Sequence, residues 1–206
     1  MPTQRTDPAP AGSAAPGPTA TGTGTVRILG IDPGSRQTGW GVIERRGASL
    51  LVLAHGTIRC SDKSLAPRLA QLSLGLRHVV REHQPDTAVL ESPFHGVNSR
   101  SLIVLAQARG ALLTTLALEA VDIAELTPAA VKRALTGNGR ADKQQVARMV
   151  RLVLGLADQR LATDTTDALA VAICYAQRLR FDRLAALGSD PGRDRQVARK
   201  PLRTKD

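Results

Sequence analysis

The order of two hydrophobic patterns along the chain most constrains its fold. Three β-prone segments come before any helical pattern: Val26–Ile31, Trp40–Glu44 and Leu50–Ile58. Beyond them, helical and strand patterns alternate. Strands that follow one another directly pair as antiparallel hairpins, whereas parallel strands need a long crossover connection, usually a helix. This order predicts an α/β fold in which helices flank a mixed sheet.

The later segments complete this scheme. The predicted helices have apolar residues about every 3.6 positions, and the predicted strands are short apolar runs. In chain order they are the helix Leu65–His83, the strand Thr87–Glu91, the helix Ser101–Glu119, the strand Val121–Leu126, and three helices over Pro128–Leu135, Lys143–Leu154 and Asp164–Leu184. We therefore expect a five-stranded sheet.

The two ends of the chain differ in composition from its middle. Residues 1–25 are almost only Pro, Ala, Gly, Thr and Ser, and a run rich in Arg and Lys follows the turn signal at Gly188–Gly192. Such segments bury too little apolar surface to offset the entropy lost on ordering. We expect disordered tails over 1–25 and 188–206 around one folded domain over 26–187.

The charge of the chain indicates a polyanionic partner. There are 28 Lys and Arg against 18 Asp and Glu, which gives a formal net charge of +10. All of the excess lies outside residues 1–25, which carry one Arg and one Asp, and +6 of it lies on residues 26–179. A basic folded surface attracts nucleic acid.

The cysteines and the hydropathy indicate the compartment. Cys60 and Cys174 are far apart and match neither a zinc spacing nor a disulfide framework. No window approaches the roughly 18–20 uninterrupted apolar residues that a membrane span needs. We expect a soluble, cytoplasmic protein with no membrane partner.

Four carboxylates stand at the ends of predicted elements. Asp32 follows an apolar strand, Glu91 ends another, and Asp164 and Asp167 share a face at the start of the last helix. Asp32 is also typical of a turn, Glu91 of a solvated strand end, and Asp164 of a first helical turn. Asp167 fits such a role less well, because an apolar stretch follows it and an unpaired buried carboxylate is costly.

If these four carboxylates converge, their mutual repulsion requires a divalent metal. Hard oxygen ligands favour Mg²⁺ or Mn²⁺. Two such ions about 4 Å apart activate a water and stabilise the leaving oxygen of a phosphoryl displacement. A basic surface around an acidic centre therefore predicts a metal-dependent nuclease.

Seven short motifs follow one another between about residues 26 and 180. They are Ile28–Ser35, Thr38–Ile43, Leu90–Glu91 with Phe94, Gln107–Gly110, Ala130–Lys132, Asp142–Val146 and Asp164–Ala170. In this order they resemble the RuvC family of crossover junction (Holliday junction) endodeoxyribonucleases. The resemblance implies a ribonuclease-H-like fold, a homodimer, and Mg²⁺-dependent nicking of two strands of a four-way DNA junction.

By matching position, the resemblance makes catalytic metal ligands of Asp32, Glu91, Asp164 and Asp167. It places Lys132 and Lys143 near the scissile strand and makes Phe94 the aromatic that stacks on a base beside the junction centre. It also implies the branch-migration proteins RuvA and RuvB as partners. The sequence departs from the family after Phe94, where His95 begins the run His-Gly-Val-Asn. This departure puts the DNA contacts of that loop in doubt.

Three other functions remain open at this point. An ATPase of the actin, heat-shock chaperone or sugar-kinase type shares the Gly-Ile-Asp-x-Gly strand but needs a second domain. A non-catalytic junction binder would share the basic surface, yet it has no reason to keep four carboxylates facing DNA. A different ribonuclease-H-like nuclease, acting on RNA or other branched DNA, is separated only by comparing substrates.

Overall fold

The computed structural model describes residues 24–92, 99–156 and 159–188 and contains the predicted five-stranded mixed sheet. Strands β1 (Thr25–Asp32), β2 (Gln37–Arg46) and β3 (Ser49–Arg59) pair antiparallel in sequence. Strands β4 (Thr87–Glu91) and β5 (Asp122–Leu126) continue the sheet in parallel beside β1, which gives the order β3-β2-β1-β4-β5. Residues 1–23 and 189–206 of the predicted tails lie outside the described residues.

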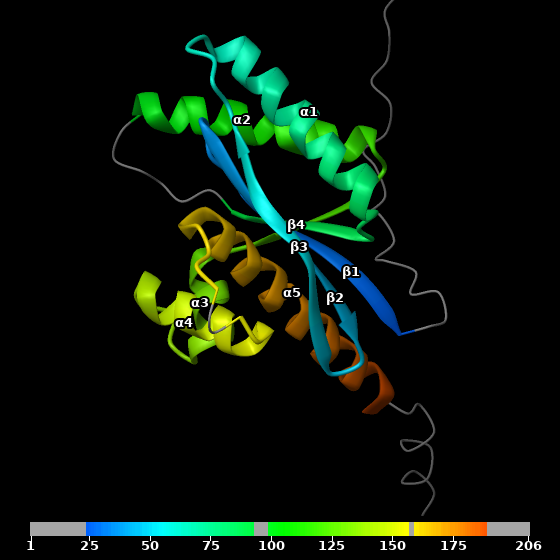
Figure 1. The fold of residues 1–206 in the computed structure, drawn as a ribbon. Coiled ribbons are helices and arrows are strands. Elements are labelled where there is room, and N and C mark those ends of the chain that lie inside the picture. The colour runs from blue at the N-terminus through cyan, green and yellow to red at the C-terminus, as the bar shows by residue number, and fades with distance from the viewer. Residues whose placement is uncertain (1–23, 93–98, 157–158, 189–206) are drawn as a thin grey trace, which may run out of the picture.

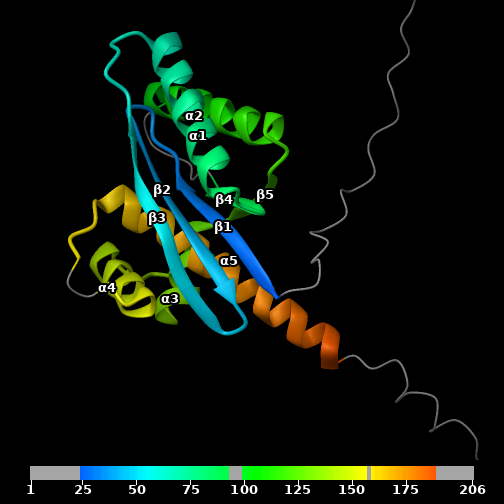
Figure 2. The same ribbon diagram turned by 45° about the vertical axis from the view of Figure 1, so that its right-hand side comes forward.

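Helices cover both faces of this sheet. On one face lie α1 (Leu65–His83) and α2 (Ser99–Leu118), and on the other lie α3 (Pro128–Thr136), α4 (Lys143–Leu154) and α5 (Thr163–Gly188). Figures 1 and 2 show these two layers from different directions. Each predicted strand and helix is present, with ends that differ by a few residues from those expected.

Two separate cores explain why the central strand is apolar without alternation. Successive residues of a strand point to opposite faces of its sheet. Ile28 of β1 belongs to the core beneath α3, α4 and α5, whereas its neighbour Leu29 belongs to the core beneath α1 and α2. Neither residue has exposed surface. A strand covered on both faces must be apolar at every position.

Capping side chains mark the first turns of the short helices α3 and α4. Thr127 accepts a hydrogen bond from the backbone N–H of Ala130, and Pro128 occupies the first turn of α3. Asp142 and Gln145 form a capping box at the start of α4. These caps determine where the helices carrying Lys132 and Lys143 begin.

Helix α5 packs with its backbone directly on the sheet. A Cβ atom at Gly30 would overlap the carbonyl oxygen of Ala168, and one at Gly39 would overlap that of Asp164. The glycines at these positions of β1 and β2 therefore permit the close approach of this helix, because they have no Cβ atom. The approach sets the height of its first turn above the strand ends.

Helix α2 is the most apolar of the helices that flank the sheet. Its stretch Ser101–Leu118 is long and apolar enough, by length and composition, to cross a membrane. In the fold, Ala108, Leu112 and Leu116 have no exposed surface and belong to the core beneath α1 and α2. Ile103 and Leu118 are instead 60% and 70% exposed. The helix therefore has two apolar faces. One face builds the core beneath α1 and α2, and the other is exposed.

Candidate active site

Asp32 and Glu91 are brought together by the pairing of their strands. Strands β1 and β4 are parallel neighbours, and their last aligned pair is Ile31 with Leu90. Asp32 and Glu91 each follow directly, so both lie at the carboxyl edge of the sheet. Ligand sites of open α/β sheets occur at this edge.

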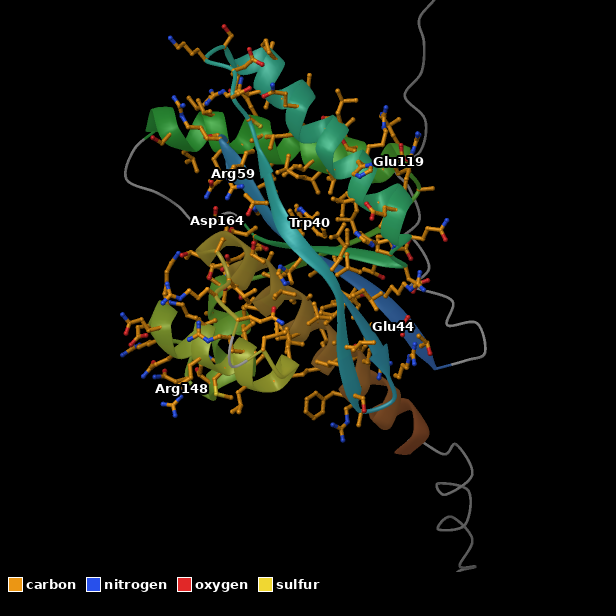
Figure 3. All side chains as sticks on the ribbon, in the orientation of Figure 1. Trp40, Glu44, Arg59, Glu119, Arg148 and Asp164 are labelled. Atoms are coloured by element: carbon orange, nitrogen blue, oxygen red, sulfur yellow. The ribbon has the colours of Figure 1, made fainter. Side chains whose placement is uncertain are left out.

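The start of α5 reaches the same edge through β2. Asp32 pairs with Gly39, and Gly39 packs against the backbone of Asp164. The buried hydroxyl of Thr165 donates to the carbonyl oxygen of Gly56 at 3.0 Å, which ties the first turn of α5 to β3. In Figure 3, Asp164 lies at this end of α5.

The carboxylates act on one another electrostatically. Burial, followed by the charges of Asp167, Asp164 and Glu91, raises the pKa of Asp32 from its ordinary 3.8 to about 7. Burial and the charge of Asp167 likewise raise the pKa of Glu91. All four predicted ligands therefore belong to one acidic cluster.

Two lysines face this cluster from α3 and α4. The Nζ atom of Lys143 lies 3.2 Å from Oδ2 of Asp167, and this carboxylate raises the pKa of the lysine. The charges of Lys143 and Lys132 partly offset the rise in the pKa of Glu91. A cleft of about 140 Å³ lies between these groups. Its lining consists of Asp32, Glu91, Pro128, Val131, Lys132, Lys143, Val146, Asp167, Ala170 and Val171.

Asp164 is held differently from the other three carboxylates. It is absent from the lining of that cleft, and its Oδ2 accepts a hydrogen bond from the side-chain amide of Gln37. Its charge nevertheless raises the pKa of Asp32 and of Lys143. Asp164 thus stands at the rim of the cluster.

The donor set fits a hard divalent cation. Carboxylate oxygens are the ligands that such ions prefer, and the repulsion that raises the pKa of Asp32 is what a cation would relieve. Among the described residues, no three acidic, histidine or cysteine side chains already surround one point as metal ligands. Asp167 instead contacts Lys143, and Asp164 contacts Gln37. Binding an ion requires these side chains to turn toward it.

The remaining predicted site residue, Phe94, lies outside the described residues, as does His95. The sequence analysis gives no site role to three residues whose contacts position the cluster: Gln37, Thr165 and Arg109. Arg109 donates from Nη1 to the backbone carbonyl of Glu91 at 2.8 Å. One signal was available for it, since an arginine inside an apolar helix needs a partner.

Comparison with known proteins points to one family. The family described as crossover junction endodeoxyribonuclease RuvC matches residues 28–175. A protein of that name from Bordetella parapertussis is 47% identical over 174 residues, covering 81% of this chain and 95% of the relative. One from Allorhizobium ampelinum is 43% identical over 163 residues, covering 79% and 96%.

Solved structures agree with this assignment. RuvC from Thermus thermophilus in complex with a Holliday junction substrate is 30% identical and has a TM-score of 0.72, covering 76% of this chain and 96% of that one. A yeast mitochondrial Holliday junction resolvase, 12% identical with a TM-score of 0.60, shares the fold. The family match and these long alignments place the chain in the RuvC family of crossover junction endodeoxyribonucleases.

Proposed function

We propose that this chain is a structure-selective endonuclease that resolves four-way (Holliday) DNA junctions in recombination and repair by paired, metal-dependent nicks. The observation that carries this proposal is the acidic cluster of Asp32, Glu91, Asp164 and Asp167 with Lys132 and Lys143 beside it. The names of the relatives, and the junction complex of the Thermus thermophilus protein, support the choice of substrate.

In this mechanism the four carboxylates hold the metal. When bound, two Mg²⁺ ions per subunit, or Mn²⁺ in their place, lower the pKa of a water and stabilise the leaving oxygen. Lys132 and Lys143 bind phosphates of the scissile strand, because both line the cleft that Asp32, Glu91 and Asp167 also line. Phe94 stacks on a base beside the junction centre.

The assembly follows from the reaction. Resolving a junction needs two symmetric cuts, and the described part of one chain carries a single acidic cluster, so a two-fold homodimer supplies both sites. The family resemblance supports RuvA and RuvB as partners. The proposed setting is the cytoplasm, where the enzyme acts as a soluble protein.

The decisive experiment compares substrates. The full chain is incubated with a mobile four-way junction, a linear duplex of the same sequence and an RNA–DNA hybrid, each with and without Mg²⁺. We expect two symmetric nicks in the junction that require Mg²⁺, and no cleavage of the duplex. Preferential cleavage of the hybrid would identify a different ribonuclease-H-like nuclease. Binding of the junction without any nick would identify a non-catalytic binder.

A further inference from the structure

Arg109 is a buried arginine within the apolar helix α2. Its side chain is 10% exposed, and Nη2 lies 2.7 Å from Oε1 of Glu125 on β5. From the same guanidinium, Nη1 donates to the carbonyl oxygen of Glu91 at 2.8 Å. One side chain on α2 thus joins the ends of two adjacent strands.

The backbone of Glu91 needs such a partner because the ladder beside it stops. Strand β1 ends at Asp32, and the next residue, Pro33, has no N–H to donate. On the β5 side, the N–H of Ser92 donates to the carbonyl of Leu126 at 2.7 Å. Arg109 supplies the donor for the Glu91 carbonyl, so the end of β4 is held from both directions.

The charge of Arg109 is directed at a different carboxylate. Nη2 of Arg109 forms an ion pair with Glu125, and the hydroxyl of Ser92 donates a hydrogen bond to Glu125 at 3.4 Å. Arg109 therefore contacts the backbone of Glu91, whereas its ion pair is formed with the carboxylate of Glu125.

We infer that Arg109 is a positioning residue, which holds the end of β4 so that the carboxylate of Glu91 faces the cluster with Asp32 and Asp167. This inference rests on the proposed function, since it gives Glu91 the role of a metal ligand. Groups that orient ligands contribute strongly to metal affinity although they do not touch the ion. Lysine, with a single ammonium group, cannot reproduce both contacts of the guanidinium.

The test measures metal binding and nicking separately. Arg109→Gln and Arg109→Lys are compared with the unmodified chain in Mn²⁺ titration calorimetry, single-turnover junction nicking, junction Kd and thermal unfolding. We expect Arg109→Gln to weaken Mn²⁺ affinity and slow nicking by about 10- to 100-fold with an unchanged junction Kd. Arg109→Lys should retain an intermediate affinity and rate.

Arg77→Gln is the matched control. Arg77 on α1 pairs with Glu119 at 3.0 Å. Its substitution therefore also removes an arginine–glutamate pair from the α1 and α2 layer, but at a place away from the acidic cluster. Because Arg81 also pairs with Glu119, we expect little change in Tm and no change in Mn²⁺ affinity. If Arg109→Gln does not fold, Glu125→Gln, which removes the charge partner of Arg109, should weaken Mn²⁺ affinity to a smaller extent.

Two results would overturn the inference. One is unchanged Mn²⁺ affinity and nicking in folded Arg109 variants. The other is a weaker junction Kd with an unchanged rate at saturating DNA, which would make Arg109 a DNA contact. A chain that binds Mn²⁺ but nicks no junction would overturn the proposed function, while the Mn²⁺ comparison between variants would still test Arg109.

Discussion

Asp32 makes the stability of the metal-free chain depend on pH. Its pKa is about 7 in the folded state, against an ordinary 3.8. Between these values the folded state binds more protons than the unfolded state, so this group lowers stability as pH rises from about 4 to about 7. Above the folded pKa the cost is constant.

We therefore predict that Asp32→Asn raises Tm in chelator-treated buffer, with a gap to the unmodified chain that widens from about pH 4 to about pH 7 and then levels off. Each kcal/mol corresponds to about 2–4 °C in a chain of this size. Differential scanning calorimetry across this range measures the gap. A gap that does not change with pH would show that Asp32 ionises normally in the fold.

The four carboxylates share one expected phenotype in catalysis. Asp32→Asn, Glu91→Gln, Asp164→Asn and Asp167→Asn should each abolish nicking, because each removes a metal ligand. Junction binding should persist or tighten, since negative charge near the DNA is lost and the basic surface is intact. Gel-shift and nicking assays on one preparation separate the two effects. Near-normal nicking by any variant would remove that residue from the site.

At the scale of elements, α3 and α4 carry the proposed phosphate contacts. Lys132→Ala and Lys143→Ala should slow nicking, and each should make the salt dependence of junction binding shallower by about one phosphate contact. Arg148→Ala on α4 is the control, since this exposed side chain lies on the outer surface of that helix in Figure 3. An unchanged salt slope in both lysine variants would mean that these lysines do not touch DNA.

The contact between α5 and the sheet leads to a prediction about packing. Gly39→Ala should lower stability by about 1–3 kcal/mol and also slow nicking, because the new methyl group displaces the backbone of Asp164. Gly41→Ala is the comparison, since its methyl group meets the side chain of Leu169, which can move more easily than backbone. Urea unfolding and single-turnover nicking measure both effects. Equal losses in the two variants would contradict a special role for the Asp164 backbone.

At the scale of the whole molecule, the outer face of α2 indicates how two copies meet. Ile103 and Leu118 on α2 are mostly exposed, as is Leu74 on α1 at 61%. Large apolar side chains grouped on one layer are typical of an interface. We predict a homodimer that buries α2, or α1 beside it. Sedimentation should give a dimer at micromolar concentration, and Ile103→Asp should shift it toward monomer without loss of fold. A monomer both free and on a junction would contradict paired cutting.

Much of the fold could be predicted because its determinants are local. Apolar spacing marked the helices, β-prone runs marked the strands, and the order of elements indicated a mixed sheet. The four carboxylates were predicted from similar local signals, since Asp32 and Glu91 end strands and Asp164 and Asp167 lie in the first two turns of α5. Hydropathy alone did not decide the place of α2, because a core helix with two apolar faces can be as apolar, by length and composition, as a helix that crosses a membrane.

The sequence by itself determined which elements form and which acidic residues end them. Tertiary structure alone decided the contacts among those residues: Lys143 with Asp167, the Asp164 backbone on Gly39, and Arg109 with the carbonyl of Glu91. Such contacts join positions far apart in the chain, and they depend on strand register and on how closely a helix approaches the sheet. A local pattern contains neither quantity, because register and approach are set by packing against residues elsewhere in the sequence.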